Sequence, residues 1–152
     1  MPESSKFTIY TDGAARGNPG ASASGFIILK EGKIISKNEI YNGIATNNYA
    51  EYNAILNALE WCKANIKGAD SPKLEVYSDS ELVVKQLNGE YKVKDQKLKS
   101  LNAKVKTLSE EFAEVQFHNV RRENPWISAV DKSINKFLDE IVEKNNSKRK
   151  II

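Results

Sequence analysis

Apolar residues occur in five short runs rich in β-branched and aromatic side chains, a composition typical of strands. The runs are Phe7–Thr11, Phe26–Leu29, Ile34–Tyr41, Leu74–Ser78 and Val115–Val120. The triplet Glu31-Gly32-Lys33 predicts a hairpin between the second and third strands. Residues 13–24, which are mostly Gly, Ala, Asn, Pro and Ser, predict a loop after the first strand.

Four other segments predict helices, because their apolar residues recur with helical spacing. The helices are expected from the capping residues Thr46-Asn47-Asn48 to about Asn65, over Ser80–Leu87, over Asp95–Phe112, and through Ile134, Leu138 and Ile141. A break is expected at Gly68–Pro72. The order β-β-β-α-β-α-α-β-α predicts an α/β fold, in which a five-stranded mixed sheet carries helices on both faces.

Four acidic residues interrupt these patterns. Asp12 and Asp79 follow apolar runs in the same Tyr-x-Asp phrase, so both side chains should leave the carboxyl ends of strands at one phase of the pleat. Glu51 and Asp131 lie near the starts of predicted helices, on the stripe that should face the core. Either of these two acids alone could simply accompany a helix N-terminus. Together they favour a metal site, because gathered carboxylates repel one another unless a divalent cation holds them.

The composition is typical of a globular domain, with 40% hydrophobic and 28% charged residues in a chain of 152. We expect one domain over residues 1–144 and a basic, frayed tail over residues 145–152. No apolar run approaches the ~20 residues of a membrane span, and the short polar start, Met1–Lys6, does not resemble a signal peptide. The single cysteine, Cys62, suits a reducing compartment. We therefore expect a cytoplasmic protein with no membrane partner, and we expect a monomer.

Positive charge is unevenly distributed, although the net charge is only +3. The segment Lys92–Lys106 holds six lysines against one acid, Asp95. A basic stripe of this kind suits a polyanionic partner such as a nucleic acid. The stripe could equally be the solvated face of a helix.

Three phrases resemble the motifs of type 1 ribonuclease H. They are residues 11–20 (TDGAARGNPG), residues 46–51 (TNNYAE) and residues 77–80 (YSDS). Residues 87–94 resemble the compact members of that family, which lack a long basic protrusion. The resemblance implies an endonuclease that hydrolyses the RNA strand of RNA–DNA hybrids and leaves 3′-hydroxyl and 5′-phosphate ends. It also implies two Mg²⁺ or Mn²⁺ ions, which agrees with an acid-only ligand set.

The ligand roles follow from the same resemblance. Asp12 would bridge both ions, Asp131 would hold the ion beside the attacking water, and Glu51 and Asp79 would hold the ion beside the leaving oxygen. A fold relative that binds hybrids without cutting them is the alternative, and the presence of all four acids favours the nuclease.

The fourth motif departs from the family pattern. Between Arg122 and Asp131 the loop is longer than in compact members and contains no histidine. Glu123 competes with Asp131 for the fourth ligand position, but it does not share the helix stripe, so we favour Asp131 and leave Glu123 an accessory role. Trp126 could be an exposed contact or an anchor of the loop Arg121–Ser128.

Small polar residues beside the acids are candidates for substrate binding. Asn18, Asn47 and Asn48 could contact the 2′-hydroxyl group by which proteins distinguish RNA from DNA. Thr46 matches a family position that binds a phosphate of the DNA strand. Helix capping is the simpler role for Thr46 and Asn47, and both roles can hold at once.

Overall fold

The computed structural model describes residues 5–66 and 72–151, so most of the break expected at Gly68–Pro72 lies outside the described residues. The elements are β1 (Lys6–Arg16), β2 (Gly20–Lys30), β3 (Lys33–Ala45), α1 (Asn47–Asn65), β4 (Lys73–Ser78), α2 (Glu81–Leu87), α3 (Gln96–Ser109), β5 (Glu114–Asn119) and α4 (Pro125–Ile151). Their order is the predicted one. None of the helices over these residues is long and apolar enough to cross a membrane.

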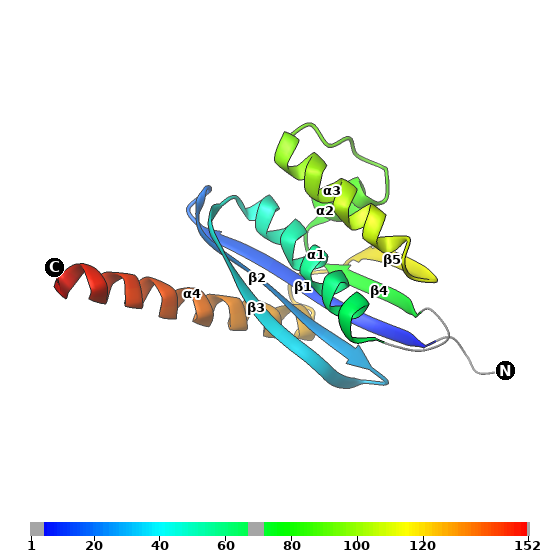
Figure 1. Ribbon diagram of the computed structural model, residues 1–152, viewed down its shortest axis with the longest axis horizontal. Coiled ribbons are helices and arrows are strands. Elements are labelled where there is room, and N and C mark those ends of the chain that lie inside the picture. The colour runs from blue at the N-terminus through cyan, green and yellow to red at the C-terminus, as the bar shows by residue number, and fades with distance from the viewer. Residues whose placement is uncertain (1–4, 67–71, 152) are drawn as a thin grey trace.

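The sheet has five strands in the order β3-β2-β1-β4-β5. β1 pairs with β2 and β2 with β3 in antiparallel register, whereas β1 pairs with β4 and β4 with β5 in parallel register. Helices α1 and α3 lie on one face of this sheet and α4 lies on the other (Figure 1). The predicted α/β fold, with a mixed sheet and helices on both faces, is confirmed.

Two apolar clusters hold these layers together. The larger one joins the sheet to α1, α2 and α3, and its buried members include Phe7, Ile9, Ile55, Leu59, Val83 and Val105. The smaller one joins the sheet to α4, and its buried members are Ala23, Ile27, Leu29, Val130, Ile134 and Leu138. β1 and β2 therefore lie between helices on both faces, and they bring the start of α1 and the start of α4 to the same region of the sheet.

The loop predicted over residues 13–24 is wrong in most of its length. β1 continues to Arg16 and β2 begins at Gly20, so only Gly17–Pro19 connects them. The small residues are needed because α1 packs tightly here: a Cβ on Gly13 would lie 2.3 Å from the carbonyl carbon of Ala50. The buried Ser24 hydroxyl donates to the Ala50 carbonyl at 2.6 Å. The small residues that suggested a loop therefore form strands against which a helix packs closely.

The start of the last helix also differs from the prediction. α4 begins at Pro125, whereas the sequence suggested a loop as far as Ser128. The Asn124 side chain accepts hydrogen bonds from the N–H groups of Trp126 and Ile127, and proline is well suited to the first helical position. Asp131 therefore lies in the second turn of the helix. The basic residues after 144 continue α4 as far as Ile151, while the division into a domain and a tail stays a prediction.

Candidate metal centre

Three of the four predicted acids meet at the carboxyl end of the parallel strand pair. Asp12, Glu51 and Asp79 each offer a carboxylate oxygen, and these oxygens all lie within 4.8 Å of one another. The residues come from β1, from the start of α1, and from the residue after β4. Residues separated by as many as 67 positions in the sequence thus form one group.

The local structure explains how each acid reaches the group. The N–H of Gly13 donates to Asp12 Oδ1 at 3.0 Å, and the missing side chain at Gly13 allows α1 to approach. The helix start that carries Glu51 is capped by the Thr46 hydroxyl, which accepts from the N–H of Tyr49 at 3.1 Å. Asp79 lies between β4 and α2, and the Ser80 hydroxyl caps α2 by accepting from the N–H of Val83.

The group is buried and its hydrogen bonding is incomplete. Asp12 is 3% exposed and Glu51 is 8% exposed. Asp12 Oδ2, Glu51 Oε2 and Asp79 Oδ1 are buried without a hydrogen-bond partner among the described residues. Leaving a buried polar atom unpaired costs about 1–3 kcal/mol, more for a charged group. The arrangement is therefore unfavourable unless protons or a cation satisfy these oxygens.

Burial raises the pKa values of all three acids, and the charges of neighbouring acids add to the effect. Burial, followed by the charge of Asp79, raises the pKa of Asp12 to about 8. Burial and the charges of Asp12 and Asp79 raise the pKa of Glu51. Burial raises the pKa of Asp79, although the Arg122 guanidinium opposes the shift. These shifts have the causes expected for carboxylates that are gathered without a counter-ion.

The donor set fits a hard divalent cation. All ligand atoms are carboxylate oxygens, which Mg²⁺ and Mn²⁺ prefer. Cys62 is buried in the larger apolar cluster, and the Nε2 atom of His118 lies 2.5 Å from Glu75 Oε2 on β4. Neither residue belongs to the acidic group, so the softer ligands that zinc favours do not contribute to it.

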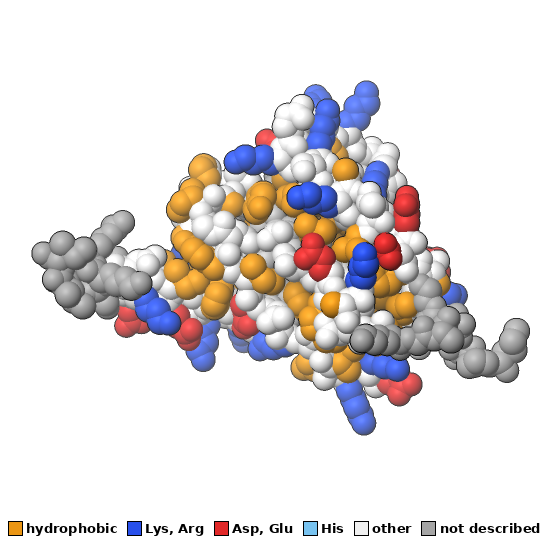
Figure 2. Space-filling model, in the orientation of Figure 1, with side chains coloured by type: hydrophobic (Ala, Val, Ile, Leu, Met, Phe, Trp, Pro, Cys, Tyr) orange, Lys and Arg blue, Asp and Glu red, His pale blue; other side chains and the backbone are white. Residues whose placement is uncertain are grey.

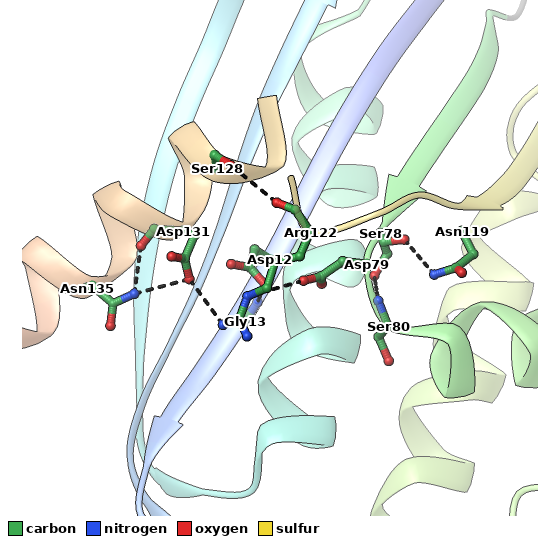
Figure 3. Close-up of polar contacts among 10 residues, drawn as sticks. All are labelled: Asp12, Gly13, Ser78, Asp79, Ser80, Asn119, Arg122, Ser128, Asp131 and Asn135. Atoms are coloured by element: carbon green, nitrogen blue, oxygen red, sulfur yellow. Dashed lines mark hydrogen bonds and ion pairs between the residues drawn. The ribbon is translucent and has the colours of Figure 1, made fainter. Parts of the chain in front are cut away.

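Asp131 lies beside this group and not within its 4.8 Å set. Its side chain is 30% exposed, and its charge contributes to the raised pKa of Asp12. Arg122 extends between the acids: its Nη2 lies 3.9 Å from Asp131 Oδ1 and its Nε lies 4.0 Å from Asp79 Oδ2 (Figure 3). Sequence analysis missed Arg122, and its only signal was its position in the loop before Asp131. Glu123 is exposed and lies outside the acidic group.

The predicted substrate residues join the β1–β2 turn to the start of α1. Asn47 accepts from the N–H of Ala15 at 2.8 Å, and the N–H of Asn47 donates to Asn18 Oδ1 at 3.0 Å. Thr46 caps α1, as one of the two alternatives predicted. Asn48 is half-buried. These contacts give three of the residues a structural role, and their contact with a substrate stays a prediction.

Trp126 lies in the first turn of α4 and anchors this helix start on the sheet. Its ring stacks on Tyr10 with centroids 6.0 Å apart, and Tyr10 stacks on Tyr77 at 5.1 Å. Tyr77 in turn stacks on His118 at 5.0 Å. The four rings thus form a row from the start of α4 across β1, β4 and β5. This stacking agrees with the anchoring role, one of the two predicted for Trp126, although the residue lies in a helix and not in a loop.

A groove of about 960 Å³ separates the start of α1 from α3. Its lining includes Pro19, Ile44, Thr46 and Tyr49 on one side and Lys97, Leu98 and Lys104 on the other. Figure 2 shows Lys and Arg side chains gathered on the part of this face that α3 and the preceding loop occupy. The basic stripe predicted over Lys92–Lys106 therefore borders a groove that passes Thr46.

The fold and the site define an α/β protein with a buried acidic group, suited to hard cations, at the ends of two parallel strands. The RNase H family model matches residues 4–147. The chain belongs to the RNase H family, and the resemblance of its motifs to type 1 ribonuclease H is confirmed.

Several relatives support this membership. The chain is 38% identical over 114 residues to Ribonuclease HI of Halobacterium salinarum, a match that covers 74% of this chain and 55% of that protein. It is 30% identical over 119 residues to Bifunctional protein Rv2228c of Mycobacterium tuberculosis, a match that covers 77% of this chain and 32% of that protein. The matched region is thus about half of the first relative and a third of the second.

Solved structures agree closely with this fold. The crystal structure of RNase H1 from Halobacterium salinarum superposes with a TM-score of 0.81 at 32% identity, and the match covers 89% of this chain and 98% of that one. The crystal structure of LC11-RNase H1 in complex with an RNA/DNA hybrid superposes with a TM-score of 0.82 at 37% identity, and the match covers 90% of this chain and 99% of that one.

Proposed function

We propose that this protein is an endonuclease that hydrolyses the RNA strand of RNA–DNA hybrids and leaves 3′-hydroxyl and 5′-phosphate ends. The observation that carries the proposal is the buried group of Asp12, Glu51 and Asp79, whose unpaired oxygens fit a divalent cation. Membership of the RNase H family supports the reaction class. The similar LC11-RNase H1, which was solved with an RNA/DNA hybrid, supports the substrate.

Asp12, Glu51, Asp79 and Asp131 would hold two Mg²⁺ or Mn²⁺ ions. Bound divalent ions lower the pKa of water and stabilise the charge that develops on a phosphodiester. The protein's own contribution is to gather Asp12 of β1, Glu51 of α1 and Asp79, the residue after β4, and to carry Asp131 beside them on α4. All four are buried or half-buried. Burial weakens solvent screening, so each charge acts more strongly on a bound phosphate or cation.

Arg122 supplies positive charge at the edge of this acidic site. A guanidinium group has donors only, and it binds phosphate oxygens with charge-assisted hydrogen bonds. Its position between Asp79 and Asp131 suits contact with the phosphate that is cleaved. This contact would also reduce the repulsion between the anionic substrate and the acids.

The groove beside α3 would bind the DNA strand of the hybrid. Lys97 and Lys104 line it, and Thr46 lies at its edge next to the acid-bearing start of α1. Phosphate contacts position a nucleic acid without reading its sequence. Asn18, Asn47 and Asn48 would then contact the RNA strand near the acids. A monomeric state and a cytoplasmic location stay predictions.

A labelled RNA–DNA hybrid tests the proposal. We expect cleavage of the RNA strand with Mg²⁺ or Mn²⁺, no cleavage with EDTA, and little action on single strands or duplex DNA. Ligation of the fragments to a 3′-hydroxyl acceptor would identify 5′-phosphate ends. Activity that survives EDTA would contradict the metal-dependent mechanism, and hybrid binding without cleavage would support a binding module instead.

A further inference from the structure

Asn135 lies on α4 one turn after Asp131 and contacts it directly. Its Nδ2 donates to Asp131 Oδ1 at 3.1 Å and to the Asp131 carbonyl at 2.9 Å (Figure 3). On its other side, Arg16 Nη2 donates to the Asn135 carbonyl at 2.9 Å and lies 3.5 Å from Asn135 Oδ1. Arg16 also forms an ion pair with Asp139 at 2.5 Å, one further turn along the helix.

The two neighbours determine which way the Asn135 amide points. Arginine has donors only, so it must face the amide oxygen. An ionised carboxylate has acceptors only, so Asp131 must face the amide NH₂ group. The reverse orientation would place donor against donor and acceptor against acceptor. Asn135 is therefore held in the orientation in which it donates to Asp131.

We propose that Asn135, held by Arg16, is a positioning residue that directs the Asp131 carboxylate toward the acidic group and so sets its affinity for a divalent cation. The proposal rests on the proposed function, because it takes Asp131 as the fourth ligand. Groups that hydrogen-bond to a ligating carboxylate orient it, and their loss typically costs about 10–100-fold in metal affinity or activity.

The chemistry of the amide suits this task. It occupies Oδ1 of Asp131 and leaves Oδ2 available to a cation. A neutral amide orients the carboxylate without cancelling its charge, whereas a lysine in the same place would compete with the cation. Asp131 depends on such help because its side chain is 30% exposed and is less confined by packing than the buried acids.

Arg16 connects this arrangement to the rest of the site. It is the last residue of β1, the strand that also carries Asp12. Its hydrogen bond to the Asn135 carbonyl therefore joins α4 to the end of β1, four residues after Asp12. The pair with Asp139 is exposed, with side-chain exposures of 36% and 67%, so its own contribution to stability is small.

The test compares Asn135→Ala with Asn145→Ala. Asn145 lies exposed on the same helix, so the control removes the same amide without touching the site.

Mn²⁺ binding to the metal-free protein is measured by titration calorimetry, thermal unfolding is followed by circular dichroism, and hybrid cleavage is measured against Mg²⁺ concentration. For Asn135→Ala we expect about 10-fold weaker Mn²⁺ binding, a nearly unchanged melting temperature, and lost turnover that excess metal restores. Asn145→Ala should match the wild type.

A merely structural role would give a different result. It would lower the melting temperature of Asn135→Ala and leave Mn²⁺ binding and the metal dependence of turnover unchanged, which would overturn the proposal. In an Asp131→Asn background, Asn135→Ala should add less than about 2-fold, because its effect acts through Asp131. Additive effects in this double variant would also overturn it.

These measurements separate the proposal from the proposed function. If the wild type binds Mn²⁺ but does not cleave hybrids, the proposed function fails, and weaker binding by Asn135→Ala still supports the role of Asn135. If the wild type cleaves hybrids and Asn135→Ala binds Mn²⁺ normally, only the role of Asn135 fails. A wild type that binds no Mn²⁺ would overturn both.

Discussion

The three clustered acids and Asp131 are held in place by different means. Asp12, Glu51 and Asp79 are attached to β1, α1 and the end of β4, which the larger apolar cluster packs together. Asp131 is attached to the opposite layer, on α4, and it is oriented by the side chain of Asn135. The first group is thus positioned by backbone packing, and the fourth acid by side-chain hydrogen bonds.

This difference has a consequence for stability as well as for function. The clustered acids are buried with unpaired oxygens, so they destabilise the metal-free protein. Asp131 is partly exposed and hydrogen-bonded, so solvent and Asn135 relieve its charge. Substitutions in the cluster should change metal binding, turnover and stability together, whereas substitutions around Asp131 should act mainly on turnover and metal affinity.

The largest expected effect comes from the cluster. Asp12→Asn, Glu51→Gln and Asp79→Asn should each reduce kcat/KM for a hybrid by about 10³-fold or more, because each removes a charge that holds the ions at the reacting phosphate. Circular dichroism and hybrid binding should remain close to those of the wild type. Variants that unfold and also lose hybrid binding would show that these acids are structural.

A smaller effect is expected at the fourth acid. Asp131→Asn should reduce kcat by about 10²-fold. Glu123 is exposed and lies outside the acidic group, so the kcat of Glu123→Gln should stay within about 3-fold of the wild-type value. Steady-state kinetics on the same hybrid measure both. If Glu123→Gln lost more turnover than Asp131→Asn, the fourth ligand would be Glu123. The difference between acids positioned by backbone packing and an acid positioned by side-chain hydrogen bonds would then no longer hold.

The stability of the metal-free protein should fall as pH rises from about 4 to about 8. The pKa of Asp12 is raised from 3.8 to about 8, so the folded state keeps a proton that the unfolded chain has already lost in this range. Asp12→Asn should remove much of this dependence, and its free energy of unfolding at pH 8 should exceed that of the wild type by about 2 kcal/mol or more, because each unit by which the pKa is raised corresponds to about 1.4 kcal/mol.

Urea unfolding in EDTA at pH 5 and pH 8 measures this difference. Asp131→Asn serves as the comparison, because Asp131 is partly exposed, and it should leave most of the pH dependence in place. Added Mg²⁺ should restore the wild type at pH 8 by binding the folded state. A metal-free wild type that gains stability over this range would contradict the raised pKa values.

The smallest expected effect concerns the basic stripe, which belongs to neither group of acids. Replacing Lys94, Lys97 and Lys99 with glutamine should raise KM roughly 10-fold and weaken its salt dependence, because phosphate contacts are lost. Turnover at saturation should be unchanged. A fall in kcat with the same KM and the same salt slope would contradict this.

The matched control is the glutamine triple variant of Lys6, Lys33 and Lys73. These exposed lysines lie at the starts of β1, β3 and β4, at the end of the sheet away from the acids. The control removes the same net charge, so it separates local phosphate contact from the overall charge of the protein.

Local patterns determined most of the fold. The five strands and four helices were predicted in the correct order, because the spacing of apolar residues reports directly on which face of an element is buried. Two local predictions were wrong for a physical reason. The small residues of 13–24 form strands because α1 packs against them, and the Asn124 cap lets α4 begin at Pro125, where propensity suggested a loop.

The sequence by itself also identified Asp12, Glu51 and Asp79 as acids that interrupt the apolar patterns, and it predicted that they gather. In the structure their carboxylate oxygens lie within 4.8 Å of one another. Only the tertiary structure placed Arg122 between Asp79 and Asp131, and only it brought Arg16 from β1 to Asn135 on α4. Periodicity describes neighbours along one element, whereas these contacts join a strand, a loop and a helix that are distant in the sequence. Which residues meet in such contacts depends on how the elements pack together, and the local sequence pattern contains no information about this packing.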